Sequence, residues 1–428
     1  MKALIQRLAL LIGLIALTLA WSPITHAAPV LDDAVVTQDF TVDFGDFTSK
    51  AQLSYPKAAR GGSPTMIMIH GGCPCDMDEA FINPDGSVQS HIFKDIADYL
   101  APRGVAVLRY NKHYITSATE VDFDKFGKLT FQQMLDDAER VLAAAKRNPH
   151  IDPKRIYIYG WSEGTIIAAA LITRHPELAG LIVQGVAASP YRASLIDPDL
   201  DVALPYLLSF SADGKITADT LKQAQAGNGG VIKYLLGDFI DPATQQGDTP
   251  AVNPLLDTNK DGVLDPDSEI KPGIGAVVDA ALAPGGPSSN YGPGRALPNV
   301  ADQAPNLKLP VLILQGENDV FSVQDGAKLD AALAANPDHT LKTYPGLGHS
   351  LGPAASRIDD AFRPITNQPL ADLSVWVLSH SSKPATLPRT GADDAPAFVW
   401  LIGIALVLIA MGAALGGRTA RGETQRFH

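Results

Sequence analysis

Continuous runs of apolar residues recur along the chain, and amphipathic stretches separate them. An unbroken apolar run is typical of a strand that is covered on both faces. Five such runs stand at residues 66–69, 105–108, 156–159, 181–183 and 311–314. Helical patterns lie between them at residues 91–100, 130–147 and 163–173. This alternation predicts right-handed βαβ units and therefore an α/β fold with a mostly parallel sheet flanked by helices.

Two parts of the chain depart from this alternation. β-rich stretches at residues 34–40 and 50–55 precede the first apolar run, which predicts antiparallel strands that lead into the sheet. Between residues 187 and 308 the strand patterns disappear, and short helical patterns and loops replace them. A stretch of about 120 residues is too long for one structureless loop, so we expect an inserted, mainly helical cap. The core then consists of residues 28–186 and 309–380, on either side of the cap at 187–308.

The N-terminus has the pattern of a targeting segment. Lys2 and Arg7 precede an apolar run at residues 8–21, and the residues up to Ala27 suit a small-residue cleavage site. We therefore predict a secretory signal peptide at residues 1–27, with an uncleaved membrane anchor as the alternative.

An uncharged apolar segment near the C-terminus has the length of a membrane span. Residues 395–417 would extend about 34 Å as a helix. Asp393 and Asp394 precede this segment, and three arginines follow it in the tail at residues 418–428. The positive-inside rule therefore predicts a transmembrane segment with its tail in the cytoplasm and the main domain outside.

The linker at residues 381–394 contains the pentapeptide Leu387-Pro388-Arg389-Thr390-Gly391. Together with the apolar segment and the basic tail, it resembles the LPxTG cell-wall sorting signal of Gram-positive-type surface proteins. The resemblance implies cleavage by a sortase between Thr390 and Gly391 and transfer of Thr390 to a cell-wall amine. The tail is longer than usual for such a signal, and the alternative is a single-pass anchor preceded by a chance match.

Charge and cysteine content narrow the classes of function. The chain has 34 Lys and Arg residues against 46 Asp and Glu residues, and the net charge of -12 argues against nucleic acid as a partner. Its two cysteines, Cys73 and Cys75, are too few to staple a secreted fold, so the core must stabilise it. Whether they are bonded stays open, and such a bond would close too small a ring to restrict the unfolded chain much.

The stretch Gly160-Trp161-Ser162-Glu163-Gly164 joins a predicted strand to a predicted helix. A serine in front of an apolar helix is often only its N-cap. The strand–turn–helix setting, however, is that of a nucleophile elbow, in which a sharp turn needs small residues on both sides of the serine. We therefore predict that Ser162 is a nucleophile.

Two later residues complete the chemistry that a serine nucleophile requires. A serine alcohol needs a base to take its proton and a carboxylate to orient that base. Asp319 follows the last apolar run, and His349 lies in a glycine-rich loop further along. Taken singly, Asp319 fits a loop-capping carboxylate and His349 a surface histidine. The order Ser162, Asp319, His349 is that of α/β-hydrolases and predicts a catalytic triad.

The tetrahedral intermediate of such a reaction needs N–H donors for its oxyanion. The start of the helix supplies the backbone N–H of Glu163. The loop after the first apolar run, which reads His70-Gly71-Gly72-Cys73, supplies that of Gly72, with Cys73 as the second choice. We interpret His70 as an organiser of this loop rather than as a catalyst.

Residues 66–186 and 311–352 resemble the α/β-hydrolase superfamily, and in particular lid-bearing esterases related to serine peptidases and dienelactone hydrolases. Besides the triad pattern, the stretches HGGCPCDMDE at 70–79 and LRYNK at 108–112 carry the resemblance. Cys73 and Cys75 depart from it, because relatives tend to have small or polar residues there. The resemblance implies an α/β-hydrolase fold with an inserted cap.

The expected function follows from these motifs and from the predicted targeting segments. We expect a secreted, surface-anchored serine hydrolase that cleaves a small-molecule carboxylic ester through an acyl-enzyme intermediate, without an organic cofactor. Cleavage of amide or peptide bonds is the second choice. A non-catalytic surface binding protein on a hydrolase scaffold is the alternative from another class.

An acidic loop in the cap has the spacing of an EF-hand. Such loops bind Ca²⁺ through oxygen atoms at positions 1, 3, 5, 7 and 9 and through a glutamate at position 12. The corresponding residues are Asp257, Asn259, Asp261, Val263 and Asp265, but Glu269 comes one residue late. The loop predicts a structural Ca²⁺ that orders the cap, and a solvated acidic turn is the alternative.

Overall fold

The computed structural model describes residues 34–59, 62–83, 85–245 and 249–382. The predicted signal peptide, the LPRTG pentapeptide, the predicted membrane span and the basic tail lie outside these residues. Within the described ranges, no helix combines the length and the apolar character that crossing a membrane requires.

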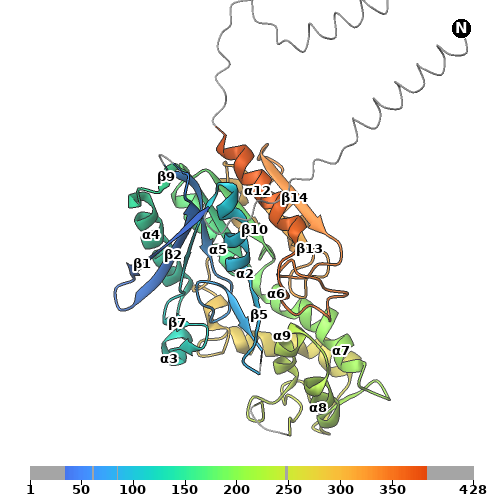
Figure 1. Cartoon of the computed structure of the whole chain (residues 1–428). Helices are drawn as coiled ribbons and strands as arrows, with labels where there is room; N and C mark the ends of the chain where they lie inside the picture. The colour runs from blue at the N-terminus through green and yellow to red at the C-terminus, as the bar shows by residue number, and fades with distance from the viewer. Residues whose placement is uncertain (1–33, 60–61, 84, 246–248, 383–428) are drawn as a thin grey trace, which may run out of the picture. The chain divides into compact units, whose positions relative to one another are not determined.

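An eight-stranded sheet forms the centre of the core, in the order β1-β2-β6-β3-β9-β10-β13-β14 (Figure 1). Its strands, in chain order, are β1 (Val35–Asp43), β2 (Thr48–Pro56), β3 (Ser63–Ile69), β6 (Ala106–Tyr110), β9 (Ile151–Trp161), β10 (Gly180–Gln184), β13 (Val311–Gly316) and β14 (His339–Tyr344). β2 pairs antiparallel with both β1 and β6. Every pairing from β6 to β14 is parallel. The predicted α/β class with a mostly parallel sheet is confirmed.

Helices cover both faces of the sheet because its inner strands bury alternate residues on opposite sides. In β3, Met66 and Met68 belong to one hydrophobic cluster, whereas Ile67 and Ile69 belong to the other. The first cluster includes α2 (Ile92–Leu100), which continues into η1 (Ala101–Arg103), and α12 (Asn367–Ser381). The second includes α4 (Phe131–Arg147), α5 (Gly164–Arg174) and α11 (Asp325–Ala332).

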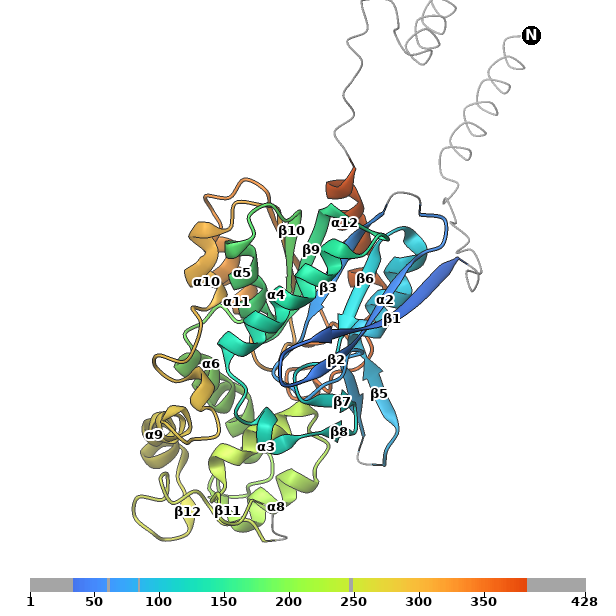
Figure 2. The ribbon, with the colours of Figure 1, turned by 90° about the vertical axis from the view of Figure 1, so that its left-hand side faces the viewer.

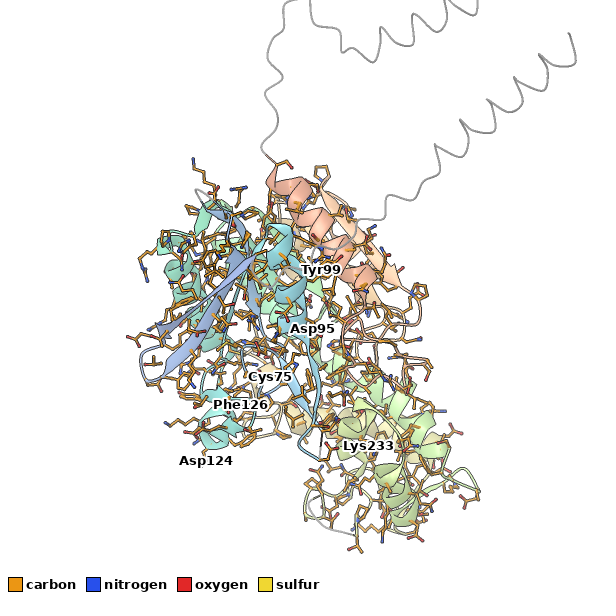
Figure 3. The ribbon with its side chains drawn as sticks, in the orientation of Figure 1. Cys75, Asp95, Tyr99, Asp124, Phe126 and Lys233 are labelled. Atoms are coloured by element: carbon orange, nitrogen blue, oxygen red, sulfur yellow. A yellow bond between two sulfur atoms is a disulfide. The ribbon has the colours of Figure 1, made fainter. Side chains whose placement is uncertain are left out.

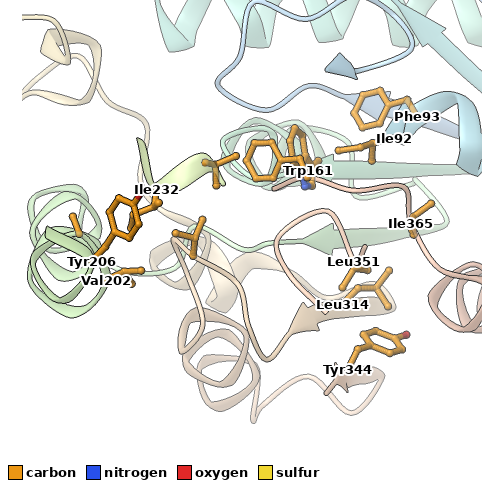
Figure 4. Packing of buried hydrophobic residues seen from close by; sticks show 14 of the residues in the cluster. Ile92, Phe93, Trp161, Val202, Tyr206, Ile232, Leu314, Tyr344, Leu351 and Ile365 are labelled. Carbon is orange, nitrogen blue, oxygen red and sulfur yellow. The ribbon is translucent and has the colours of Figure 1, made fainter. Parts of the chain in front are cut away.

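Residues 187–308, the cap, are mainly helical. Their elements are α6 (Tyr191–Pro198), η2 (Asp199–Ala203), α7 (Leu204–Leu208), β11 (Ile216–Thr217), α8 (Ala218–Ala226), η3 (Val231–Phe239), β12 (Val263–Leu264), η4 (Pro266–Ile270), α9 (Lys271–Leu282), η5 (Ser289–Tyr291), α10 (Val300–Gln303) and η6 (Ala304–Asn306). Helices α8 and α9 lie at one end of the core (Figures 1 and 2), and α7 lies at the same end (Figure 1). Val202, Tyr206 and Ile232 of the cap share a hydrophobic cluster with Trp161 and Leu351 of the core (Figure 4).

Two small hairpins extend from the core, and the sequence patterns did not predict them. They are β4 (Ala80–Ile82) with β5 (Val88–His91), and β7 (Ile115–Ser117) with β8 (Glu120–Val121), which leads into α3 (Phe123–Phe126). The first hairpin is fixed to a distant loop, because the Ser90 hydroxyl donates to the carbonyl oxygen of Phe362 at 2.6 Å.

Candidate active site

Ser162 occupies the sharp turn between β9 and α5, with its backbone in the left-handed region at φ 54°. A Cβ atom on Gly160 would come within 2.5 Å of the carbonyl oxygen of Gly164. A Cβ atom on Gly164 would overlap the carbonyl oxygens of Ile69 and His70. Close packing on both sides of Ser162 therefore requires the two glycines of the motif. The N-cap of α5 is Glu163, so Ser162 does not hold that position.

Asp319 and His349, which are 30 residues apart in the chain, lie side by side. Nδ1 of His349 is 2.8 Å from Oδ2 of Asp319, and both side chains are buried, with 2% and 0% of their surfaces exposed. The other oxygen of Asp319 accepts the backbone N–H groups of Phe321 and Ser322 at 2.9 and 3.0 Å. Asp319 therefore caps its own loop and also holds the histidine, and His349 is not a surface residue.

The contact between Asp319 and His349 shifts the pKa values of both groups. Burial alone would raise the pKa of Asp319, but His349 and the N–H groups of Ser322 and Phe321 lower it to about 2. Burial alone would lower the pKa of His349, but the charge and hydrogen bond of Asp319, with the charge of Asp360, raise it above its usual value. The arrangement favours an ionised Asp319 and a more basic imidazole, which suits general base chemistry.

His349 is held beside the elbow through its main chain. Its carbonyl oxygen accepts the indole N–H of Trp161 and the amide of Gln184, both at 3.2 Å. A Cβ atom on Gly185 would lie 2.6 Å from Cε1 of the imidazole. Among the described residues, the hydroxyl of Ser162 has no hydrogen-bond partner, so the Ser162–His349 hydrogen bond is not made here. Such bonds commonly form only when substrate is present.

Aromatic rings surround the imidazole of His349. The ring centroids of Trp161, Phe321 and Phe362 lie 5.2, 5.3 and 5.5 Å from it. Phe81, from the hairpin β4–β5, packs edge-on against Phe362 at 4.7 Å. The surroundings of the base are therefore apolar, which strengthens its interaction with Asp319.

The loop after β3 offers backbone N–H groups next to Ser162. A Cβ atom on Gly71 would lie 3.3 Å from Cβ of Ser162. The N–H of Gly71 is already bound to Oε1 of Glu79 at 3.1 Å. Within the part of the chain that the structure describes, the N–H groups of Gly72 and Glu163 have no acceptor. These two donors, which are the ones predicted from the sequence, are free to bind an oxyanion.

Glu79 organises this loop, and the sequence patterns did not single it out. It is fully buried at φ 49°, and its carboxylate accepts from Nδ1 of His70 as well as from Gly71. The other ring nitrogen of His70 faces the carbonyl oxygen of Tyr110 at 2.5 Å. Both ring nitrogens of His70 therefore have partners, one in its own loop and one at the end of β6.

A largely buried ion pair between Lys112 and Glu163, which the sequence also did not reveal, connects the loop after β3 to the turn of Ser162. It also contacts the cap. Nζ of Lys112 donates to the carbonyl oxygen of Gly71 at 2.6 Å and to Oε1 of Glu163 at 3.0 Å. The hydroxyl of Tyr291, in the cap, donates to the other carboxylate oxygen of Glu163. Lys112 belongs to the LRYNK stretch noted above, but nothing in a single sequence reveals the residue that it pairs with.

Cys73 and Cys75 form a disulfide, with their Cα atoms 5.2 Å apart. The bond lies directly after Gly72, and Cys75, labelled in Figure 3, is buried. Sγ of Cys73 is 3.0 Å from Oε1 of Glu79. The bond therefore braces the loop that carries the free N–H of Gly72.

Hydrogen bonds within the acidic loop of the cap, residues 257–269, hold its backbone in place. The carboxylate of Asp257 accepts from the N–H groups of Asp261 and Gly262 at 3.1 and 3.0 Å, and Asp265 pairs with Lys215. The carboxylate of Glu269 accepts from the N–H of Asp265 at 2.9 Å. Among the described residues, no three carboxylates of this loop have oxygen atoms that all lie within 4.8 Å of one another.

Two family models match parts of this chain. The model of the prolyl oligopeptidase family matches residues 93–210, which include Ser162. The model of the dienelactone hydrolase family matches residues 276–368, which include Asp319 and His349. Between them, the two matches cover the three residues of the predicted triad.

Individual proteins and solved structures show only partial or low sequence similarity to this chain. The chain is 31% identical to the esterase EstD of Thermotoga maritima over 147 residues, which are 34% of this chain and 32% of that esterase. The crystal structure of the proline iminopeptidase of Mycobacterium smegmatis is 18% identical, with a TM-score of 0.46, over 80% of this chain and 98% of that chain. Est1E of Butyrivibrio proteoclasticus is 16% identical, with a TM-score of 0.42, over 81% and 99%. The chain thus has the strand order of an α/β-hydrolase fold, and parts of it are similar to esterases, dienelactone hydrolases and the prolyl oligopeptidase family.

Proposed function

We propose that the chain is a serine hydrolase that cleaves carboxylic esters. The observation that carries this proposal is the left-handed turn of Ser162, set between unoccupied N–H groups on one side and the Asp319–His349 pair on the other. A serine that serves only structure has no need of a strained backbone together with these neighbours.

In the proposed reaction, Oγ of Ser162 attacks the acyl carbon and His349 accepts its proton at Nε2. Asp319 binds Nδ1–H, which fixes the tautomer in which Nε2 is free to accept. The N–H groups of Gly72 and Glu163 stabilise the negative oxygen of the tetrahedral intermediate. His349 then returns the proton to the leaving alcohol, and a water molecule, activated in the same way, releases the acid from Ser162.

Replacing the nucleophile tests this proposal directly. Ser162→Ala should abolish hydrolysis of p-nitrophenyl esters and labelling by a fluorophosphonate. Ser211→Ala, at a partly exposed serine of the cap, should behave as wild type. Full activity of Ser162→Ala would refute the proposal. A wild-type chain that is neither labelled nor active would favour the non-catalytic binding protein instead.

Peptide or amide cleavage is the second candidate, because the prolyl oligopeptidase model covers the segment with Ser162. The same residues would serve both reactions, and the leaving group alone differs. A panel of acyl esters of increasing length, assayed beside aminoacyl and peptide amides, separates the two. Higher kcat/KM on the amides would reverse the preference.

We also propose that the hydrolase domain lies outside the cell, anchored through LPRTG to the cell wall by a sortase or held by the predicted membrane span. The Cys73–Cys75 disulfide supports an oxidising compartment. In cell fractionation, the domain should be released by digestion of the wall, and Thr390→Ala should transfer it to the membrane fraction. An unchanged distribution would leave the membrane anchor as the explanation.

Calcium binding by the acidic loop stays a prediction, and we propose it as structural. An ion at this loop would compete with Lys215 for Asp265, whereas Val263 would contribute its carbonyl oxygen and Asn259 its side chain. Metal analysis of dialysed protein after calcium loading should find one ion per chain, and Asp261→Ala should lose it. Absence of bound calcium in the wild type would end this proposal.

A further inference from the structure

Asp360 lies in the loop that follows His349, and no motif in the sequence marks it. Its side chain is buried, with 1% of the residue exposed. A single carboxylate oxygen, Oδ2, accepts the backbone N–H of His349 at 2.8 Å and that of Val320 at 3.2 Å. Val320 directly follows Asp319, so one oxygen atom of Asp360 ties the histidine loop to the loop of the acid.

The carboxylate of Asp360 packs closely against the backbone of Gly348. A Cβ atom on Gly348 would overlap Oδ1 of Asp360, so the residue before His349 has to be a glycine for the carboxylate to fit. The N–H of Gly348 binds the carbonyl oxygen of Gly352 at 2.9 Å, which closes the histidine loop on itself. The carboxylate of Asp360 and the histidine loop therefore pack closely against each other.

The carboxylate of Asp360 forms no ion pair with a lysine or an arginine among the described residues. The nearby Asp319 and Asp359 pair with His349 and Arg363, whereas Asp360 forms no ion pair within the described ranges. Burial, together with the charge of Asp319, raises the pKa of Asp360. An unpaired buried carboxylate costs free energy, and its hydrogen bonds to the two loops are what offset that cost.

The main chain of Asp360 is hydrogen-bonded to the cap. Its carbonyl oxygen accepts the N–H of Val231, the first residue of η3, at 2.9 Å. A Cβ atom on Gly230 would overlap that same carbonyl oxygen. The N–H of Gly230 also approaches the carbonyl oxygen of Ile358 at 3.3 Å. The cap therefore reaches the histidine loop at the residue whose side chain holds His349.

We propose that Asp360 is a positioning residue: its carboxylate fixes His349 against Asp319, and its carbonyl oxygen joins this pair to the docked cap. The inference rests on the proposed hydrolase function. Asp360 does not touch the reacting atoms; it acts through the main chain of His349 and through its negative charge beside the imidazole.

Two substitutions at Asp360 separate these effects. Asp360→Ala removes the acceptor of both N–H groups. Asp360→Asn retains an oxygen that can stand in the place of Oδ2 but removes the charge. The matched control is Asp359→Ala, which removes a partly exposed carboxylate one residue earlier, where it pairs with Arg363.

We expect Asp360→Ala to lower kcat at least about tenfold with little change in KM, because small displacements of a catalytic base are costly. Asp360→Asn should lie between Asp360→Ala and wild type. The acid limb of the pH profile of kcat/KM should move to lower pH in both variants, because the charge of Asp360 raises the pKa of His349. Asp359→Ala should show wild-type kcat and an unmoved acid limb.

An unmoved acid limb in Asp360→Asn, or a kcat of Asp360→Ala equal to that of Asp359→Ala, would overturn the inference. If Asp360→Ala does not fold, the acid limb of Asp360→Asn decides. Failure of the proposed function looks different, because wild type itself would then escape fluorophosphonate labelling and Ser162→Ala would be indistinguishable from it.

Discussion

On the oxyanion side of Ser162, charged side chains hold the loop in place, whereas on the histidine side backbone N–H groups gather around carboxylates. The first side depends on Glu79 with His70, on Lys112 with Glu163, and on a disulfide. On the second side, the carboxylates of Asp319 and Asp360 accept main-chain N–H groups. Within the described ranges, neither carboxylate forms an ion pair with a lysine or an arginine. The oxyanion side is therefore expected to respond to the loss of single charges, and the histidine side to the geometry of its loops.

The largest effect should come from the histidine side. His349→Gln removes the proposed proton acceptor but keeps a polar side chain of similar length, so kcat for ester hydrolysis should fall by about 1000-fold or more. His339→Gln, at a partly exposed histidine in β14, should leave kcat unchanged. A loss of less than tenfold in His349→Gln would mean that another group takes the proton from Ser162.

The oxyanion side is tested by Lys112→Met, which keeps the length of the side chain and removes its charge. Glu163, whose side chain is only 10% exposed, would lose its cation, and the carbonyl oxygen of Gly71 would lose its donor. We expect a loss of about 3 kcal/mol in the free energy of unfolding and a fall in kcat of about tenfold to a hundredfold. Denaturant titration and ester kinetics measure the two quantities.

The control for Lys112→Met is Lys146→Met, because Lys146 pairs with Glu177 at the surface. Exposed pairs contribute about 0 to 1 kcal/mol, so this variant should resemble wild type. If both lysine variants lose the same amount, the burial of the Lys112–Glu163 pair has no special role, and the contrast between the two sides fails.

The pH profile should show the coupling of Asp319 and His349. Protonation of His349 abolishes the base, so kcat/KM should fall about tenfold per pH unit on the acid side. Because the pKa of His349 is raised, the midpoint of this fall should lie above the usual pKa of a histidine. A midpoint below that usual value would contradict the description of the pair.

The pKa shifts of His349 and Asp319 make the stability of the fold depend on pH in opposite directions. The raised pKa of His349 contributes stability that is present at low pH and is lost as the pH rises through the folded-state value. Asp319, with its pKa lowered to about 2, contributes stability that is present above its ordinary pKa and is lost as the pH falls towards 2. Thermal unfolding across this range measures both.

The smallest effect should come from the disulfide. The double variant Cys73→Ser/Cys75→Ser should change the melting temperature little, because the closed loop is very short. We expect kcat to fall by a few fold, because the N–H of Gly72 loses its brace. A large fall in melting temperature with unchanged kcat would show that the bond serves the fold rather than the site.

The sequence predicted the sheet because strands leave local patterns of apolar residues, and the proposed triad residues were likewise chosen from local motifs. The apolar run at residues 66–69 lies within β3, and Asp319 follows β13, where parallel strands end at a common edge. Thr130 and Gln133 form the capping box that starts α4, close to its predicted first residue.

Glu79, Lys112 and Asp360 could not be found in the same way. Each acts through a partner that is distant in the sequence or through a backbone atom, and such contacts exist only after the loops have packed together. The hairpin β4–β5 escaped prediction because its strands are short and lack a clear alternation of apolar and polar residues. Buried polar contacts thus carry information that no periodic pattern contains.

The Cys73–Cys75 bond also has a practical consequence for producing the protein. A reducing bacterial cytoplasm would yield the chain as a dithiol, and export to a periplasm would yield it oxidised. Preparations from the two hosts would have the same sequence but differ in the chemical state of the loop beside Gly72. Thiol titration of each preparation is therefore the quality control that makes activities from different laboratories comparable.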